Sequence, residues 1–155
     1  MSADSMNPTM AFPPNVRVLA VDPGTKRWGV AVGDSATGQA KPLHTVTGEF
    51  SVAITRIVKL ARSERADFVL LGRPVHMNDA ESGMTKLSDR AGEALKAAGL
   101  NVIAYDERLT SFSAEEYLKD SGQKFSHNKA LVDRVSAALM LESAFREQLF
   151  TEPTP

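Results

Sequence analysis

The chain has 155 residues, no cysteine and a formal net charge of −1 at pH 7, which excludes disulfide bonds and thiolate metal sites. At this length we expect one domain that buries roughly 70% of its extended surface, and no segment is long and apolar enough to span a bilayer. The charge lacks the strongly basic signature of many nucleic-acid-binding domains without excluding that function. The composition is compatible with a reducing cytoplasm, where we expect the protein.

The first half of the chain predicts a tail, three strands and a helix. Residues 1–15 contain three prolines and lack the basic start and apolar run of a signal peptide, so we expect a flexible tail. The apolar run over 16–22 predicts a buried strand that ends at Asp22, where Pro23-Gly24 predicts a tight turn. Residues 28–34 and 41–47 predict two further strands, the first joined to 16–22 as an antiparallel hairpin. Helical spacing of apolar residues from Phe50 predicts a helix that ends near Arg65.

The second half alternates strands and helices. We expect strands at 67–72 and 101–106, with a helix over 84–98 between them that Gly99 ends. A capping box at Ser113 predicts a short helix to about residue 120, and a last helix is expected over 128–149, followed by a tail at 150–155. The pattern predicts one α/β domain over 16–149, in which helices flank a mixed five-stranded sheet whose first three strands are antiparallel.

Asp22 is the first candidate for chemistry because it closes a buried strand. A carboxylate beside an apolar core needs a cation, and Lys26, Arg27 or a divalent metal could supply it. The alternative is a turn residue whose side chain accepts hydrogen bonds from nearby backbone N–H groups. Lys26 and Arg27 stand in a turn where cations and backbone amides could meet phosphate. The basic residues of the first predicted helix fit a solvated helix face instead: Arg56, Lys59, Arg62 and Arg65.

Two further acids extend this pattern. The strand over 101–106 runs into Asp106-Glu107, whose side chains alternate between faces, and Asp106 is the expected surface or capping acid. Asp133 shares a helix face with packing residues, so it should point toward the sheet. One interpretation of Asp133 is an ion pair with Arg27 or Lys129. The other is that Asp22, Glu107 and Asp133 hold one or two Mg²⁺ or Mn²⁺ ions that activate water for phosphodiester hydrolysis.

Four motifs in order resemble the YqgF/RuvX family over nearly the whole stretch from Val16 to about Leu149. They are DPGTKRWGVAVGD at 22–34, GRP at 72–74, DERLT at 106–110 and KALVDRVSAAL at 129–139. The resemblance implies an RNase H-like fold and a metal-dependent nuclease, described for the family as a Holliday junction resolvase and as a nuclease that matures the 5′ end of pre-16S rRNA. The acidic trio of the family falls on Asp22, Glu107 and Asp133. The implied nucleic-acid contacts are Gly24, Thr25, Lys26, Arg27, Arg73, Arg108 and Lys129.

The resemblance leaves the substrate open between branched DNA and precursor rRNA. A resolvase makes two symmetric nicks, so we expect a homodimer at least on the substrate. The loop at 75–83 departs from the family, since its glycine, Gly83, comes later than usual. Its His76 is interpreted as a bystander rather than a phosphate contact, and Ser136 replaces a common Ala without expected effect. Two alternatives are an actin-like ATPase-type phosphate binder, which needs a second lobe, and a non-catalytic RNase H-like nucleic-acid-binding module.

Overall fold

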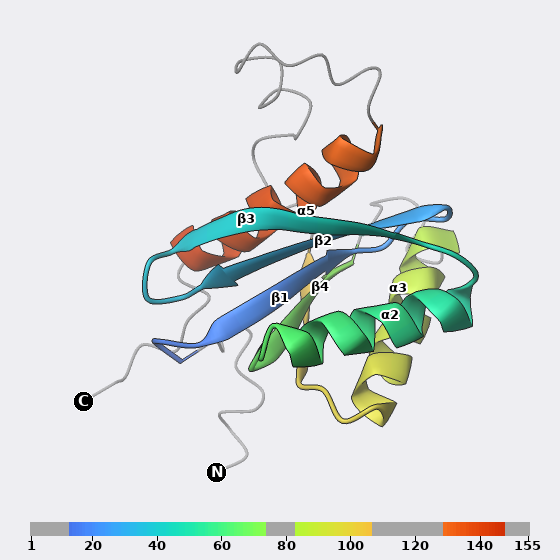
Figure 1. Ribbon diagram of the computed structural model, residues 1–155, viewed down its shortest axis with the longest axis horizontal. Coiled ribbons are helices and arrows are strands. Elements are labelled where there is room, and N and C mark those ends of the chain that lie inside the picture. Colours follow the sequence, from blue (N-terminus) through green and yellow to red (C-terminus); the bar gives the residue numbers. More distant parts are fainter. Residues whose placement is uncertain (1–12, 74–82, 107–128, 148–155) are drawn as a thin grey trace.

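The computed structural model describes residues 13–73, 83–106 and 129–147 (Figure 1). Five strands in the described part form one sheet in the order β3-β2-β1-β4-β5. They are β1 (Arg17–Asp22), β2 (Arg27–Asp34), β3 (Gln39–Thr47), β4 (Phe68–Arg73) and β5 (Val102–Asp106). The helices are α2 (Phe50–Ser63), α3 (Gly83–Ala97) and α5 (Lys129–Arg146). The short helix expected from Ser113 falls outside the described residues.

The sheet is mixed, as the sequence predicts. β1 pairs antiparallel with β2, and β2 pairs antiparallel with β3. β4 lies parallel to both β1 and β5, which the intervening helices allow because each crossover returns the chain to the same end of the sheet. The carboxyl ends of β1, β4 and β5 therefore meet at one edge of the molecule, and Asp22 lies there.

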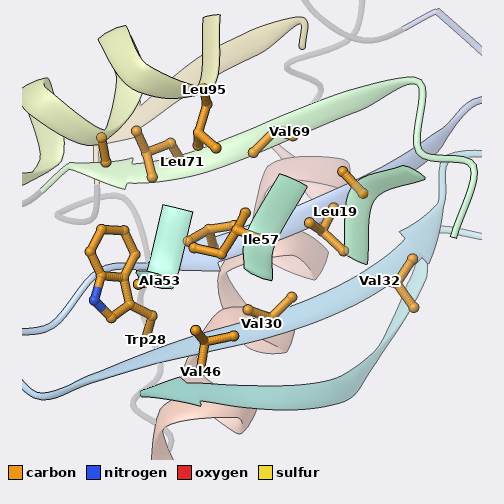
Figure 2. Close-up of a cluster of buried hydrophobic side chains, with 13 residues drawn as sticks. Leu19, Trp28, Val30, Val32, Val46, Ala53, Ile57, Val69, Leu71 and Leu95 are labelled. Carbon is orange, nitrogen blue, oxygen red and sulfur yellow. The ribbon is translucent and has the colours of Figure 1, made fainter. Parts of the chain in front are cut away.

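Helices cover both faces of the sheet: α5 packs on one face, and α2 and α3 pack on the other (Figure 1). Figure 2 shows the core between the sheet and α2 and α3, where Trp28, Val30 and Ile57 meet. Alternate strand residues point to the second core under α5, which contains Val18 and Tyr105. All of these side chains are buried, so both faces of the central strands contribute to the hydrophobic stabilisation.

An arginine ties the opposite end of the sheet to α2. Arg17 donates to the Glu64 carboxylate at 2.6 Å and to Asp34 at 3.2 Å, and its Nε donates to the Glu64 carbonyl oxygen. The hydrogen bond to Glu64 is the largest of the effects that raise the pKa of Arg17 above its usual value. This network fixes the start of β1, far along the strand from Asp22.

Candidate active site

Strand alternation places Asp22 on the α5 face of the sheet. Leu19 and Val21 pack toward α2 and α3, whereas Val18 and Ala20 pack toward α5. Asp22 is the next residue in the second series and is half-buried at the end of β1. Asp22 also takes part in at least one polar or electrostatic interaction. The carboxylate therefore belongs to the side of the sheet that α5 covers.

Gly29 brings α5 to the same place. Asp22 is the register partner of Gly29 on β2. A β-carbon on Gly29 would lie 1.9 Å from the carbonyl oxygen of Asp133 and 2.3 Å from its carbonyl carbon, so only a hydrogen fits between β2 and the backbone of α5. Asp22 and Asp133, more than a hundred residues apart in the sequence, therefore both adjoin Gly29.

Asp133 forms an ion pair with Arg27 at this point. Its Oδ2 accepts a hydrogen bond from Arg27 Nε at 2.6 Å, a short distance typical of charge-assisted bonds. The two side chains are 27% and 33% exposed, so the pair is partly shielded from water. Of the two ion-pair partners that the sequence left open for Asp133, the structure shows Arg27. The phosphate contact expected of Arg27 stays a prediction.

The turn between β1 and β2 lies beside these acids and has one exposed cation, Lys26. A β-carbon on Gly24 would lie 2.2 Å from the carbonyl oxygen of Arg27, so this tight turn requires glycine. Pro23 is buried, whereas Thr25 and Lys26 are exposed. Lys26 therefore lies at the surface in the turn that joins the strands of Asp22 and Arg27.

The start of α5 is anchored to the edge strand by Thr45. Its Oγ1 donates to the carbonyl oxygen of Ala130 at 2.7 Å and accepts from Arg134 Nη1 at 3.2 Å. Thr45 is also the register partner of Gly29. Asp22, Gly29 and Thr45 therefore form a row of paired residues across β1, β2 and β3, and the first turns of α5 lie over this row. Neither Gly29 nor Thr45 was predicted from the sequence as part of the site, although a glycine between Trp28 and Val30 in a strand is a recognised signal of close backbone approach.

Arg73 lies on the other face of the sheet. β4 alternates so that Val69 and Leu71 pack toward α2 and α3, and Arg73 continues that series. Its Nε donates to Asp89 Oδ1 on α3 at 2.7 Å, and its Nη2 donates to Oδ2 at 3.3 Å. This hydrogen bonding is the main reason why the pKa of Asp89 is lowered. The nucleic-acid contact expected of Arg73 stays a prediction, and its guanidinium is bound to Asp89.

The two acids fit a hard cation by the chemistry of their donors, because carboxylate oxygens beside backbone carbonyls suit Mg²⁺ or Mn²⁺. Within the described ranges no group of three Asp, Glu or His side chains is close enough to hold a metal ion. The third expected ligand, Glu107, lies outside the described residues, as do Arg108 and His76. Lys129 begins α5. The described part of the site thus consists of two acids, with Arg27 bound to one of them.

Comparisons with known proteins agree with this fold. Two solved structures of RuvC from Thermus thermophilus, one in complex with a Holliday junction substrate, superpose with TM-scores of 0.59 and 0.54 at 19% and 20% identity. The alignment with the complex covers 85% of this chain and 96% of that one. The large terminase nuclease of phage G20c matches with a TM-score of 0.52 at 16% identity. These likenesses show an RNase H-like fold.

Relatives found by sequence share more identical residues with this chain than these solved structures do. A protein of Azotobacter vinelandii named "Putative pre-16S rRNA nuclease" is 35% identical over 84% of this chain and 94% of its own length. A protein of the same name from Dechloromonas aromatica is 36% identical over 88% and 95%. In the described part of the chain no helix has the length and apolar character needed to cross a membrane. The model of the family described as "RuvX: Holliday junction resolvase" matches residues 16–147, so the chain belongs to the RuvX (YqgF) family.

Proposed function

We propose that the protein is a divalent-metal-dependent endonuclease that hydrolyses phosphodiester bonds in structured nucleic acid. The observation that carries the proposal is the meeting of Asp22 and Asp133 at Gly29, on the α5 face and at the carboxyl end of β1. Ligands gather at this end of strands in open α/β sheets. A nuclease needs carboxylates at this position to hold cations against phosphate.

Asp22, Asp133 and Glu107 are the residues proposed to hold the metal. Ile103 and Tyr105 of β5 pack toward α5. Glu107 lies outside the described residues and is proposed as the third ligand because the acidic trio of the family falls on it. One or two bound ions would supply an activated water and neutralise the charge on the phosphate oxygens. The carboxylates need no nucleophilic side chain beside them for this reaction.

Arg27 has two proposed roles in this site. Its guanidinium neutralises Asp133 and holds the carboxylate in one orientation through the 2.6 Å contact. Arg27 must turn away from Oδ2 before that oxygen can accept another cation, because the two cations would occupy the same position. Once turned, Arg27 would lie with Lys26 beside the turn, where both can contact a phosphate of the substrate.

The proposed substrates are a branched DNA and a precursor of 16S rRNA, and a homodimer is proposed on a four-way junction because its two strands are cut symmetrically. A side-by-side assay of a labelled four-way junction and a 5′-extended rRNA precursor, with Mg²⁺ and with Mn²⁺, decides between them. The mapped cleavage positions show whether the cuts on the junction are paired.

Asp22→Asn tests the site. We expect it to abolish metal-dependent cleavage while the thermal melting temperature is retained, because an amide keeps the shape of the side chain and removes its charge. Asp106→Asn is the matched control, since Asp106 ends β5 on the α3 face, and it should leave cleavage intact. Cleavage by Asp22→Asn at the parental rate would refute the proposal, and saturable ATP binding in calorimetry would favour the phosphate-binder alternative.

A further inference from the structure

A groove on the α2 face collects basic side chains at the edge of the sheet. It has a volume of about 370 Å³ and is lined by His44 of β3 and by Arg56, Lys59, Leu60 and Ser63 of α2. Three of these five residues are basic and none is acidic. Glu49 and Glu64, which flank α2 in the sequence, do not line the groove, and Glu64 is bound to Arg17.

Arg56 and Lys59 of the groove differ from three other arginines of the protein in having no carboxylate partner among the described residues. Arg17, Arg27 and Arg73 each form an ion pair with a carboxylate. In the ranges that the structure describes, neither Arg56 nor Lys59 has such a pair, and both are exposed. Arg56 donates one hydrogen bond, from Nη1 to the Thr47 carbonyl oxygen at 3.3 Å, and Arg62 donates to the Ala98 carbonyl oxygen after α3, so neither charge is neutralised by a carboxylate in the described ranges.

The edge strand beside the groove is poorly suited to pair with another strand. β3 is the outer strand of the sheet and contains Pro42, which has no backbone N–H to donate. Its pairing with β2 shifts register between Val30 and Ala31, so Leu43 is an extra residue in β3. Proline and bulges are features that protect edges from strand addition. A ligand of this groove is therefore bound by its charge through side chains and not as an added peptide strand.

The groove begins level with the candidate active site. Asp22, Gly29 and Thr45 form one row across β1, β2 and β3, and His44 is the neighbour of Thr45 on the opposite face. Two strand spacings, about 10 Å, separate the backbone of Asp22 from the edge. Arg134 lies on the α5 side of Thr45, so cations stand on both sides of the edge strand. Because α5 covers this face of β2, a backbone of phosphates that leaves the active site reaches the groove on the α2 face by passing around the edge strand β3.

We propose that the groove formed by His44, Arg56 and Lys59 binds the phosphate backbone of the nucleic-acid substrate beyond the cleavage site. This inference rests on the proposed nuclease function. Its ligand is the negatively charged backbone and not a base, because positive charge is the property that Arg56 and Lys59 share, and contacts to phosphate carry no sequence information. The groove would thereby add affinity and orient a strand without discriminating between sequences.

The salt dependence of binding tests the inference. Fluorescence anisotropy of a labelled four-way DNA junction is measured over a series of KCl concentrations in EDTA, which prevents cleavage. Arg56→Gln/Lys59→Gln removes two phosphate contacts, so the slope of log K against log salt should become shallower by about 1.8. If the lost contribution vanishes at 1 M salt, the affinity falls about 60-fold at 0.1 M. His44→Gln alone should weaken binding less.

Arg65→Gln/Lys86→Gln is the matched control, because it removes the same charge from exposed positions outside the groove. The inference is overturned if the two double variants change the slope equally, or if the groove variant leaves it unchanged. Binding of a Glu-rich peptide that only the groove variant loses, with an unchanged slope for the junction, would instead assign the groove to an acidic protein. Failure of the proposed function has a different signature, since the parent chain would then bind the junction without cutting it when metal is added.

Discussion

Gly29→Ala is the most direct test of how the fold assembles the active site. The new β-carbon would lie 1.9 Å from the Asp133 carbonyl oxygen, whereas real β-carbons essentially never approach such atoms within 3.0 Å. The backbone of α5 must therefore move away from β2 by about 1.1 Å. Overpacking of this kind costs about 1–3 kcal/mol, and we expect the upper end because both contacting groups are backbone. For a domain of this size, that lowers the melting temperature by roughly 6–12 °C.

The same displacement should reduce cleavage more than it reduces folding. Asp133 would move by about 1 Å relative to Asp22, and a misplacement of that size costs about 100-fold in rate. Melting temperature and single-turnover cleavage are measured on the same preparation, at a temperature where the variant is fully folded. Gly92→Ala is the control, because its β-carbon would lie 3.4 Å from Leu71 Cδ2, an ordinary contact, and alanine in a helix should stabilise by about 0.5–1 kcal/mol. A Gly29→Ala protein with the parental melting temperature and rate would refute the reasoning.

Two further predictions concern the ion pairs. Arg27→Gln should tighten Mn²⁺ binding several-fold in calorimetry, because no guanidinium then competes for Asp133 Oδ2. Lys26→Gln is the control and should leave Mn²⁺ binding unchanged. Weaker Mn²⁺ binding by Arg27→Gln would contradict the proposed competition. Arg73 lowers the pKa of Asp89, so this pair stabilises the fold above the carboxyl's unfolded pKa, and the contribution disappears as the pH falls through the lower folded pKa. Asp89→Asn should therefore cost about 0.5 kcal/mol of unfolding free energy at pH 7 and nothing at a pH below the folded pKa, and an equal cost under both conditions would contradict the assignment.

The sequence predicts the elements well because their signals are local. Apolar runs closed by Asp22 and by Arg73-Pro74 predicted β1 and β4 to within a residue. The helix expected over 84–98 is α3, and Gly99 beyond it has a φ of +95°, the left-handed conformation that glycine tolerates. Propensity, periodicity and turn chemistry depend only on neighbours in the chain. The mixed sheet followed from the same information, because short connections favour antiparallel pairs and helical crossovers favour parallel ones.

The inward direction of Asp133 was also predictable, because its helix face carries Ala137, Met140 and Ala144, which are buried in the core under α5. The sequence could not decide which partner the carboxylate meets. Arg27 and Lys129 were both open, and the structure selects Arg27 because the start of β2 and the second turn of α5 meet there. Sequence spacing holds no information about a contact between residues 106 positions apart.

The sequence by itself thus determined which acids and cations the protein brings to the ends of its strands. Only the tertiary structure decided which of these residues lie next to one another. Asp22 and Asp133 adjoin because Gly29 has no side chain and lets α5 rest on β2. Arg73 is on the opposite face with Asp89, and Arg56 and Lys59 line a groove with His44. The physical reason is that alternation assigns each side chain to a face, whereas the packing of helices on those faces sets the contacts between distant segments.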